Sequence, residues 1–466
     1  MYETLFRSFV NPLFEGVIKK RETLKLRDEL EASQWLSTAE IQSIQWQNLQ
    51  KLLAHAYQQV PYWEKVFRAV DMRPEDISSY ADFCRLPLIS RTTLQENMTG
   101  MLARGNQGRL SIKHTGGSTG DPLTFYYDNG SYQHRVAMAK RGYGWANCED
   151  GRRQFHLWGM AEHRKSAVTR IKTNLHRAIL RHKYFNCLHF NDARKLACLQ
   201  LMNRFKPRVI IAYPGALYRL ARFIDDNDLK LTFTPDSIIA AAEKLFETQR
   251  STIENVFRAS CYNSYGSREF MLLAMECEAH DGLHVSSENI FLEIIGDDGQ
   301  PVSPGEQGEI VVTDLHNYGM PFIRYRIGDQ AVQGSPDDAC PCGRGMPKIK
   351  DVTGRTLDII RLPDGNEIPG EFFVRYIGRN PGVAQFRVTQ YTRDRLVIEL
   401  VVDHQFTEQV FNGIKKNLRK VLGDSVEPDF RFVDRLDATP TGKFRITVSF
   451  VDQGEQGAPD PGLETH

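Results

Sequence analysis

The chain has 466 residues, which is too long for one compact core of ordinary size and predicts two or three domains. Lys and Arg total 59 and Asp and Glu total 58, so the net charge of +1 excludes a global field that attracts nucleic acid or an anionic membrane. Hydrophobic residues make up 41% of the chain, and no apolar run approaches the ~20 residues of a membrane span. The sequence therefore predicts a soluble, multidomain globular protein that binds any anion locally.

The N-terminus and the cysteines indicate the compartment. The chain begins Met-Tyr-Glu-Thr and lacks the basic start, apolar core and small-residue cleavage site of a secretory signal, so we expect a cytoplasmic location. Eight cysteines are too sparse for a disulfide framework in a chain of this length. They are expected to be buried thiols, with one candidate metal cluster among them.

Residues 1–100 are expected to form a helical N-terminal region of the large domain. An apolar stripe near its start precedes the basic run Lys19-Lys20-Arg21 and comprises Leu5, Phe6, Phe9, Val10, Leu13, Phe14, Val17 and Ile18. A helix packed on its own domain is the commoner arrangement for such a stripe. Weak peripheral association with a membrane surface is the alternative.

Residues 101–357 alternate between predicted strands and helices, which favours an α/β core. Strands are expected at 123–127, 209–213 and 237–241, and a helix to residue 226 follows the second of them. Turn-rich segments separate short strands over 290–335, where Pro304-Gly305-Glu306-Gln307-Gly308 is an example. This last part is expected to be an antiparallel subdomain.

Residues 358–453 have the pattern of a small α+β domain. Strands are predicted near 385–390 and 395–401, a helix follows at 407–422, and a final strand closes the segment. Residues 454–466 are rich in Gly, Pro and acidic residues, which predicts a flexible tail.

One Gly-rich segment stands out as a candidate phosphate loop. It reads Thr115-Gly116-Gly117-Ser118-Thr119-Gly120-Asp121-Pro122 and precedes a predicted strand. Three glycines let backbone N–H groups turn toward an anion, and the hydroxyl groups add donors. No Gly-Lys-Ser/Thr ends the segment, so it is not a P-loop. A Gly-rich hairpin loop without a ligand is the alternative.

Five further segments follow in chain order. They are Ala241-Ala242-Glu243, Asn263-Ser264-Tyr265-Gly266-Ser267-Arg268-Glu269, Tyr325-Arg326-Ile327-Gly328-Asp329, Gly354-Arg355-Thr356-Leu357-Asp358 and Pro440-Thr441-Gly442-Lys443. Together with the Gly-rich loop, this order resembles the adenylate-forming superfamily, and within it the phenylacetate-CoA ligase-like family, which includes members linked to capsular polysaccharide synthesis. The likeness extends over about residues 30–450.

The resemblance implies the fold of the adenylate-forming enzymes. That fold is α/β, with a large multi-layer N-terminal domain that contains an antiparallel subdomain, followed by a small, mobile α+β lid domain. It also implies ATP and Mg²⁺ as ligands, with coenzyme A as the expected co-substrate.

The resemblance assigns nucleotide contacts to several of these segments. The loop from Thr115 to Gly120 would hold the ATP phosphates. Ala242 and Glu243 would lie along the adenine, and Asn263, Tyr265 and Gly266 would also bind the nucleotide, with the Tyr265 ring stacked on the base. An aromatic face suits a purine on physical grounds alone.

The remaining assignments concern charge. Glu269 would ligate Mg²⁺, since a hard cation prefers carboxylate oxygen. Asp329 would accept hydrogen bonds from both ribose hydroxyls. Arg355 would contact nucleotide oxygens, and Lys443 would contact the substrate carboxylate and the α-phosphate. In isolation Tyr265 and Glu269 would be interpreted as a core aromatic residue and a solvated acid.

Two positions depart from the family pattern. Asp121 stands where the loop often has Lys, and Arg268 stands where Thr is usual. Arg268 is expected to reach phosphate oxygens and to compensate for both losses, which makes it a candidate catalytic residue beside Lys443 and Glu269. The alternative is altered or impaired nucleotide use.

The cysteine cluster predicts a metal site. Cys340 and Cys342 are separated by one residue, and Cys277 and His284 lie upstream. Three sulfurs and one imidazole make a tetrahedral zinc set, which would be structural. The alternatives for the fourth ligand are His280, Glu276 and Glu278, and the alternative to zinc is a group of inert thiols.

The predicted function is ATP-dependent activation of a carboxylic acid as an acyl-adenylate, followed by transfer to coenzyme A. One alternative is an amide ligase that uses an amine acceptor in surface-polysaccharide modification, and another is a non-catalytic nucleotide-binding relative. The expected partners are small molecules, with no nucleic acid. The sequence identifies neither the acid nor the acceptor, and it leaves monomer and homodimer open.

Lys443 provides the first test. Attack of a carboxylate on a phosphate brings like charges together, so a placed cation stabilises this transition state strongly. We expect Lys443→Ala to lower adenylate formation by at least about 100-fold with ATP binding nearly intact. Pyrophosphate exchange measures the first quantity, and an exchange rate like that of the wild type would refute the assignment.

Overall fold

The computed structural model describes residues 2–105, 110–114, 123–159, 166–187, 190–335, 338–355, 360–364, 367–368, 373, 376–378, 380–423, 426–436 and 446–451. The chain divides into two compact units. The first comprises Met1–Leu245 and Thr252–Thr353, and the second comprises Phe246–Ser251 and Gly354–His466.

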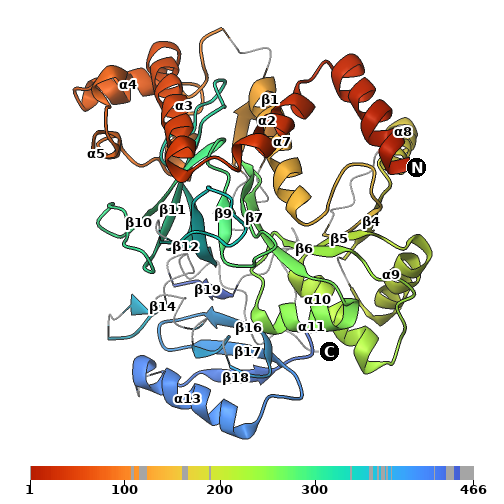
Figure 1. Ribbon diagram of the computed structural model, residues 1–466. Coiled ribbons are helices and arrows are strands. Elements are labelled where there is room, and N and C mark those ends of the chain that lie inside the picture. The colour runs from red at the N-terminus through yellow and green to blue at the C-terminus, as the bar shows by residue number, and fades with distance from the viewer. Residues whose placement is uncertain are drawn as a thin grey trace. The chain divides into compact units, whose positions relative to one another are not determined.

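A mixed sheet forms the centre of the first unit. Within the described residues its strand order is β10-β11-β12-β13-β9-β8-β7-β6-β5-β3-β4, from left to right in Figure 1. The strands are β3 (Gln154–Trp158), β4 (His182–Asn186), β5 (Val209–Ala212), β6 (Ser237–Ala241), β7 (Cys261–Ser267), β8 (Met271–Met275), β9 (Leu283–Val285), β10 (Ile290–Ile295), β11 (Gln307–Asp314), β12 (Tyr325–Gln333) and β13 (Lys348–Arg355). A separate antiparallel pair consists of β1 (Ser111–His114) and β2 (Thr124–Tyr127).

The sheet is parallel at one end and antiparallel at the other. Strands β3 to β7 pair in parallel, and their connections are α8 (Ala167–Ile179), α9 (Asp192–Phe205), α10 (Pro214–Asp226) and α11 (Glu247–Phe257). Strands β5 and β6 are buried along their whole length, which explains their continuous apolar sequences. From β7 onward, β7 pairs with β8, β8 with β9, β10 with β11 and β11 with β12, and all four pairings are antiparallel. The predicted α/β class with an antiparallel subdomain is confirmed.

Helices before the sheet build the predicted N-terminal helical region. They are α2 (Thr23–Ser33), α3 (Thr38–Gln59), α4 (Pro61–Ala69), η3 (Pro74–Asp76), α5 (Tyr80–Cys84) and α6 (Arg91–Glu96), and α7 (Asn129–Trp145) follows β2. Helix α3 begins at a capping box, in which Ser37 and Glu40 bond each other's backbone N–H groups. The core of this region contains Trp63, Phe67 and Phe83, none of which is accessible to solvent.

The first residues differ from the favoured expectation of a helix packed on its own domain. The helical segment is divided into α1 (Tyr2–Leu5) and the π-helical η1 (Phe6–Val10) and η2 (Leu13–Ile18). Phe6 is buried, but Phe9 and Val17 are 68% and 65% exposed. The segment is held instead by polar contacts, because Asn11 Nδ2 donates to Asp150 Oδ2 at 2.9 Å. Across the described ranges, every helix is too short or too polar to cross a membrane.

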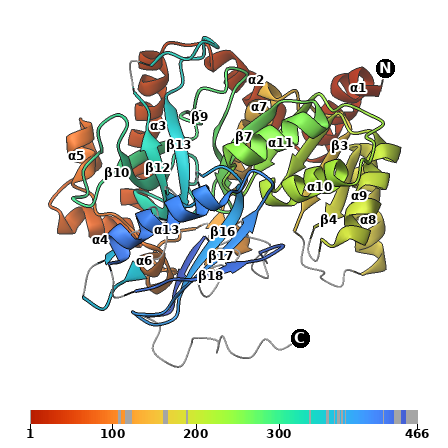
Figure 2. The same cartoon turned by 90° about the horizontal axis from the view of Figure 1, so that it is seen from below.

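The second unit is a small α+β domain, as predicted. Its sheet has the order β18-β17-β16-β19, formed by β16 (Val383–Gln390), β17 (Leu396–Val402), β18 (Asp429–Phe432) and β19 (Thr447–Ser449), and β14 (Ile360–Arg361) pairs with β15 (Glu367–Ile368). Helix α13 (Glu408–Leu422), capped by Thr407, lies across these strands (Figure 2). Its buried residues Ile414, Leu418 and Leu422 close the core of the unit.

A buried charge network fixes the N-terminal helices to the antiparallel strands. Arg324 and Glu293 are 2% and 4% exposed, and Arg324 Nη2 donates to Glu293 Oε1 at 3.0 Å. Arg324 Nη1 also donates to the carbonyl oxygens of Cys84 and Leu86, and Tyr80 Oη donates to Glu293. Burial raises the pKa of Glu293 even though Arg324 opposes the shift. The pair is therefore costly to disrupt on one side only.

We expect Arg324→Met to lower the free energy of unfolding by about 3–5 kcal/mol, because it leaves the Glu293 carboxyl buried without its cation. Denaturant unfolding monitored by tryptophan fluorescence measures the change. Arg326 is the matched control, since it lies two residues away and its side chain is 49% exposed beside Glu309. Arg326→Met is expected to cost less than about 1 kcal/mol, and equal effects of the two substitutions would contradict this account.

Candidate active site

The carboxyl ends of the parallel strands gather several candidate residues at one edge of the sheet. Strand β3 has β4 on one side and β5 on the other, so the chain reverses its direction of winding there. Ligands bind at such a switch point in open α/β sheets. Trp158 ends β3 and Tyr213 follows β5, and their ring centroids are 4.4 Å apart. Both aromatic side chains therefore lie at this switch point.

The turn after β6 places Glu243 at the same edge. Ala242 has φ +68°, a left-handed conformation that is costly for a residue with a Cβ. Glu243 Oε2 then accepts a hydrogen bond from the Gly215 N–H at 3.0 Å, at the first turn of α10. A carboxylate at a helix N-terminus is stabilised by the unpaired N–H groups there. The observed role of Glu243 is thus to join the β6 turn to α10.

Strand β7 carries the Tyr-Gly segment to the next position along the edge. The Tyr265 hydroxyl donates a hydrogen bond to Asp329 Oδ2 at 2.9 Å, although 64 residues separate the two in sequence. Gly266 makes the tight return to β8, since a Cβ at this position would lie 2.0 Å from the carbonyl oxygen of Met271. The structure therefore brings together the two residues assigned to adenine and ribose.

Arg268 lies beside the start of the Gly-rich loop. Its Nε donates to the carbonyl oxygen of His114 at 3.2 Å, and His114 is the residue before Thr115. Lys113, the preceding residue, lies near Arg268 and Arg135: burial lowers the pKa of Lys113, and the charges of Arg135 and Arg268 lower it further. These cations form a positive region at the residues that precede the Gly-rich segment.

Lys113 was not among the residues predicted from the sequence. The signal that could have identified it is a lysine two residues before the Gly-rich segment, in a loop that lacks its usual lysine at position 121. Its ammonium group also lies 4.9 Å from the centre of the Tyr127 ring, which holds the side chain against β2.

The structure also describes the surroundings of Glu269 and Asn263, two other residues to which the resemblance gives a role. Glu269 is 9% exposed, in the turn between β7 and β8. The Asn263 N–H donates to Glu276 Oε2 at 2.8 Å, and the same carboxylate oxygen lies 3.0 Å from His280 Nδ1. Glu276 and His280 are therefore engaged with β7.

Several of the predicted site residues lie outside the part of the chain that the structure describes. These are the loop Thr115 to Gly120 with Asp121, the side chain of Arg355, Asp358 and Lys443. Two further large aromatic residues of this unit lie away from the switch point. Phe270 is fully buried against Phe322, with ring centroids 5.3 Å apart, and Trp145 contacts His284.

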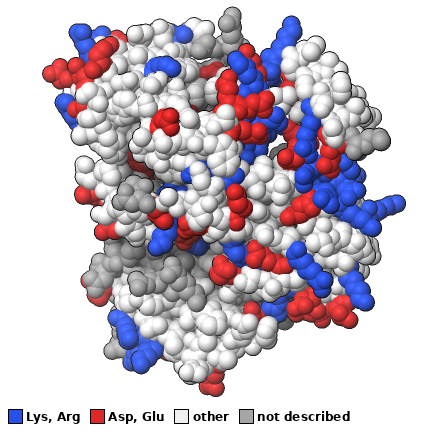
Figure 3. All heavy atoms as spheres, viewed as in Figure 1, with Lys and Arg blue, Asp and Glu red and all other residues white. Residues whose placement is uncertain are grey.

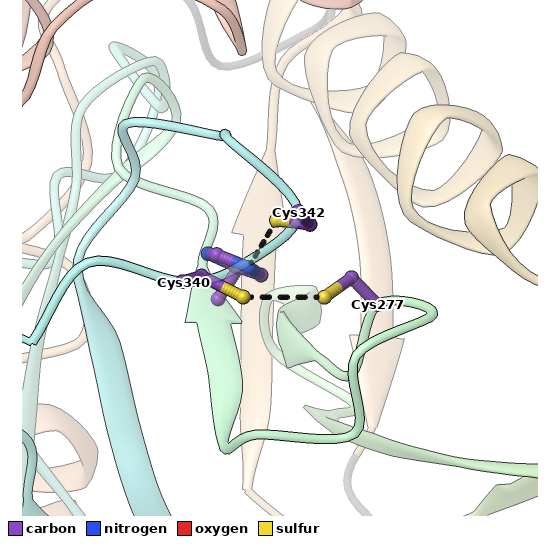
Figure 4. Close-up of side chains that lie close together, drawn as sticks. Cys277, Cys340 and Cys342 are labelled. Atoms are coloured by element: carbon purple, nitrogen blue, oxygen red, sulfur yellow. Dashed lines mark hydrogen bonds between the residues drawn. The ribbon is translucent and has the colours of Figure 1, made fainter.

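Cys277, His284, Cys340 and Cys342 converge on one point, and their ligand atoms all lie within 4.8 Å of one another. The three thiols face one another in Figure 4, with 3.6 Å between Cys277 Sγ and Cys340 Sγ. His284 Nε2 is 3.3 Å from Cys342 Sγ. Such a set of donors fits a tetrahedral soft-ligand site.

The surroundings of the cluster also suit a metal. His284 Nδ1 lies 3.1 Å from the Met346 carbonyl oxygen, which leaves Nε2 directed at the cluster. Burial lowers the pKa of His284 to about 4, so its ring is neutral near pH 7. Of the alternatives for the fourth ligand, His280 contacts Glu276, and Glu278 forms an ion pair with Arg344.

Comparisons with known proteins find relatives in the family that the sequence motifs resemble. Residues 360–449 match the family model of the CapK C-terminal domain. Protein CapK of Staphylococcus aureus is 23% identical over 380 residues, which cover 79% of this chain and 80% of the relative. The phenylacetate-coenzyme A ligase of Aromatoleum evansii is 24% identical over 425 residues, covering 86% and 90%.

Among solved structures, a 2-hydroxyisobutyryl-CoA ligase in the postadenylation state has the same fold. Its TM-score is 0.70 at 18% sequence identity, and the match covers 91% of this chain and 92% of that one. These findings confirm the family resemblance and the fold predicted from the ordered motifs.

Proposed function

We propose that this homologue of Protein CapK and the phenylacetate-CoA ligases, whose fold is that of the adenylate-forming CoA ligases, uses ATP to activate a carboxylic acid as an acyl-adenylate. The observation that carries the proposal is the hydrogen bond from Tyr265 to Asp329. It joins the segments assigned to the base and to the ribose, at the sheet edge where α/β proteins bind nucleotides.

Each residue of the proposed nucleotide site has a separate role. The Tyr265 ring offers an aromatic face to adenine, and Asp329, partly buried beside it, has acceptor capacity for the ribose hydroxyls in addition to the Tyr265 hydroxyl. Arg268 and Lys113 supply positive charge at the entrance to the phosphate loop. This answers the departure at Asp121, because the cationic contact can come from β1 and from the turn after β7.

The proposed reaction has two steps. A carboxylate oxygen of the substrate attacks the α-phosphorus of ATP, the bond to the β-phosphate oxygen breaks, and pyrophosphate leaves. Fixed cations stabilise the charge that gathers on the phosphoryl oxygens, and Lys443 and Arg268 are the residues proposed for this role. Mg²⁺, held by Glu269, would shield the same phosphates. A nucleophile then attacks the acyl carbon and AMP leaves.

The nucleophile that we favour is the thiol of coenzyme A. Four of the curated relatives are named phenylacetate-coenzyme A ligases, which supports this choice. An amine acceptor would give an amide by the same displacement, and it is the second outcome that the experiment below distinguishes.

We also propose a structural zinc at Cys277, His284, Cys340 and Cys342. Four protein ligands complete a tetrahedral set and leave no position for a reactive water. The ligands come from the segment after β8, from β9 and from the segment before β13. An ion held there would fasten three connections of the antiparallel subdomain, so its effect is expected on stability.

Asp329→Ala tests the nucleotide site. Loss of two charge-assisted hydrogen bonds to the ribose is expected to lower kcat/KM for ATP by about 100-fold or more in carboxylate-dependent pyrophosphate exchange, measured with a panel of aryl, fatty and amino acids. Tyr265→Phe keeps the ring and removes only the hydroxyl, so its loss should stay below about tenfold. Asp297→Ala, at an exposed turn of the same unit, is the control and should change nothing.

The same assay separates the alternatives. Exchange that requires a carboxylate, followed by AMP release on addition of coenzyme A, supports the proposal. AMP release with an amine alone identifies an amide ligase. Absence of exchange with every acid, in protein that unfolds at the normal temperature, would refute an adenylation activity.

Metal analysis of protein purified without a His-tag tests the zinc site. We expect about one equivalent of zinc, and a value below about half an equivalent would count against the site. Cys342→Ser is expected to lose the metal and to lower the unfolding temperature. Cys84→Ser is the matched control, because this thiol is also partly exposed and lies outside the cluster. It should retain the metal.

A further inference from the structure

Two helical segments at the surface of the first unit expose apolar side chains to solvent and direct polar side chains toward the protein. The N-terminal segment (residues 2–18) turns polar side chains toward the protein: Arg7 Nη1 lies 2.5 Å from Glu149 Oε2, and Asn11 bonds Asp150. Phe6 is buried, but several other apolar side chains of the segment point outward, with Phe9 68% and Val17 65% exposed. An amphipathic helix that packs for its own stability has the opposite arrangement.

Helix α8 shows the same reversal. Its outward residues Val168, Ile171 and Leu175 are 75%, 67% and 61% exposed. Its inward side carries Arg177, whose guanidinium group lies 4.1 Å from the centre of the Tyr184 ring. The spacing of three and four residues places the apolar side chains on one face of the helix. Within the described part of the unit, that face is open to solvent.

The two segments are neighbours. The Tyr2 hydroxyl donates to the carbonyl oxygen of Ile179 at 2.6 Å, and the rings of Phe14 and His176 are 5.7 Å apart. Figure 3 shows a mostly uncharged area over the N-terminal helices at the upper right. We call the outward faces of residues 2–18 and of α8 together the apolar face.

The charges next to the apolar face are basic. Helix α8 contains Arg170 and Lys172 and no acidic residue, and Lys19 and Lys20 follow the N-terminal segment. All four are exposed. The acidic residues of the N-terminal segment are already paired, because Glu3 lies within 4 Å of Arg7 and Arg152, and Glu15 contacts Arg21. The apolar face therefore combines exposed hydrophobic groups with a surplus of positive charge.

We propose that the apolar face docks this protein on an anionic lipid bilayer, in the plane of the interface. Apolar side chains of a surface helix enter the boundary between headgroups and acyl chains, and Lys and Arg beside them contact anionic headgroups. A second copy of the chain fits this face less well, since a two-fold contact would oppose the same lysines and arginines. The net charge of +1 does not argue against docking, because the surplus is local.

Co-sedimentation with vesicles tests the proposal on the full chain. We expect the wild type to bind vesicles that contain phosphatidylglycerol, to bind pure phosphatidylcholine vesicles weakly, and to dissociate as salt rises. Phe9→Ser with Ile171→Ser should lower the bound fraction by about tenfold or more. Lys19→Glu with Lys172→Glu should do the same on the anionic vesicles only.

Matched changes on α13 serve as controls. Val421→Ser changes an exposed apolar side chain, and the pair Lys416→Glu with Lys420→Glu changes two exposed lysines, at surface positions of the other unit; both should leave binding unchanged. The thermal unfolding temperature should be the same for all variants, because the altered side chains are exposed. Absence of binding to anionic vesicles, or equal binding by the double variants, would overturn the proposal. A dimer that the Phe9 and Ile171 changes convert to a monomer, without vesicle binding, would assign the face to a second copy.

Discussion

Strand β7 is the constraint on which the candidate site depends. It pairs in parallel with β6 and antiparallel with β8, so the two halves of the large sheet meet along it. The return to β8 is so tight that only Gly fits at position 266. These pairings fix the register of β7 in the sheet. They therefore fix the position of the segment from Tyr265 to Glu269 beside the turn that carries Glu243.

Buried charges complete the positioning of the site. Arg135 and Asp314 are both 1% exposed at the side chain and lie 2.5 Å apart, and Arg141 forms a similar pair with Glu288. Both arginines belong to α7, which is thereby fixed to β11 and to the segment before β10. Such pairs contribute little net stability, but they penalise any arrangement that separates the partners. Arg135 also lies close enough to Lys113 to raise the positive potential at the entrance to the loop.

The cysteine cluster acts on a different part of the sheet. His284 lies in the short strand β9, which pairs with β8 and β13, and the three cysteines lie before and after this strand in the chain. A strand of three residues contributes few hydrogen bonds to the sheet. The proposed ion would therefore add to the stability of this part of the sheet. The Tyr265–Asp329 pair, the cluster and the apolar face thus occupy separate positions in the first unit, and each can be altered without direct change to the others.

The sequence by itself determined the ordered motifs, and with them the family resemblance and the α/β class. It also predicted the strands at 209–213 and 237–241, which the structure has at 209–212 and 237–241. These features depend on local patterns: continuous apolar runs, Gly-rich turns and short motifs. It also identified Tyr265, Asp329 and the four residues of the cluster as candidates. Only the tertiary structure decided that Tyr265 bonds Asp329, that Lys113 joins Arg268, and that His284 and not His280 completes the cluster, because these contacts depend on the order of strands in the sheet. Periodicity likewise revealed the apolar stripe of the first residues but not its direction. Which face of a helix meets the protein is decided by its neighbours, and here Asp150 and Glu149 hold the polar side.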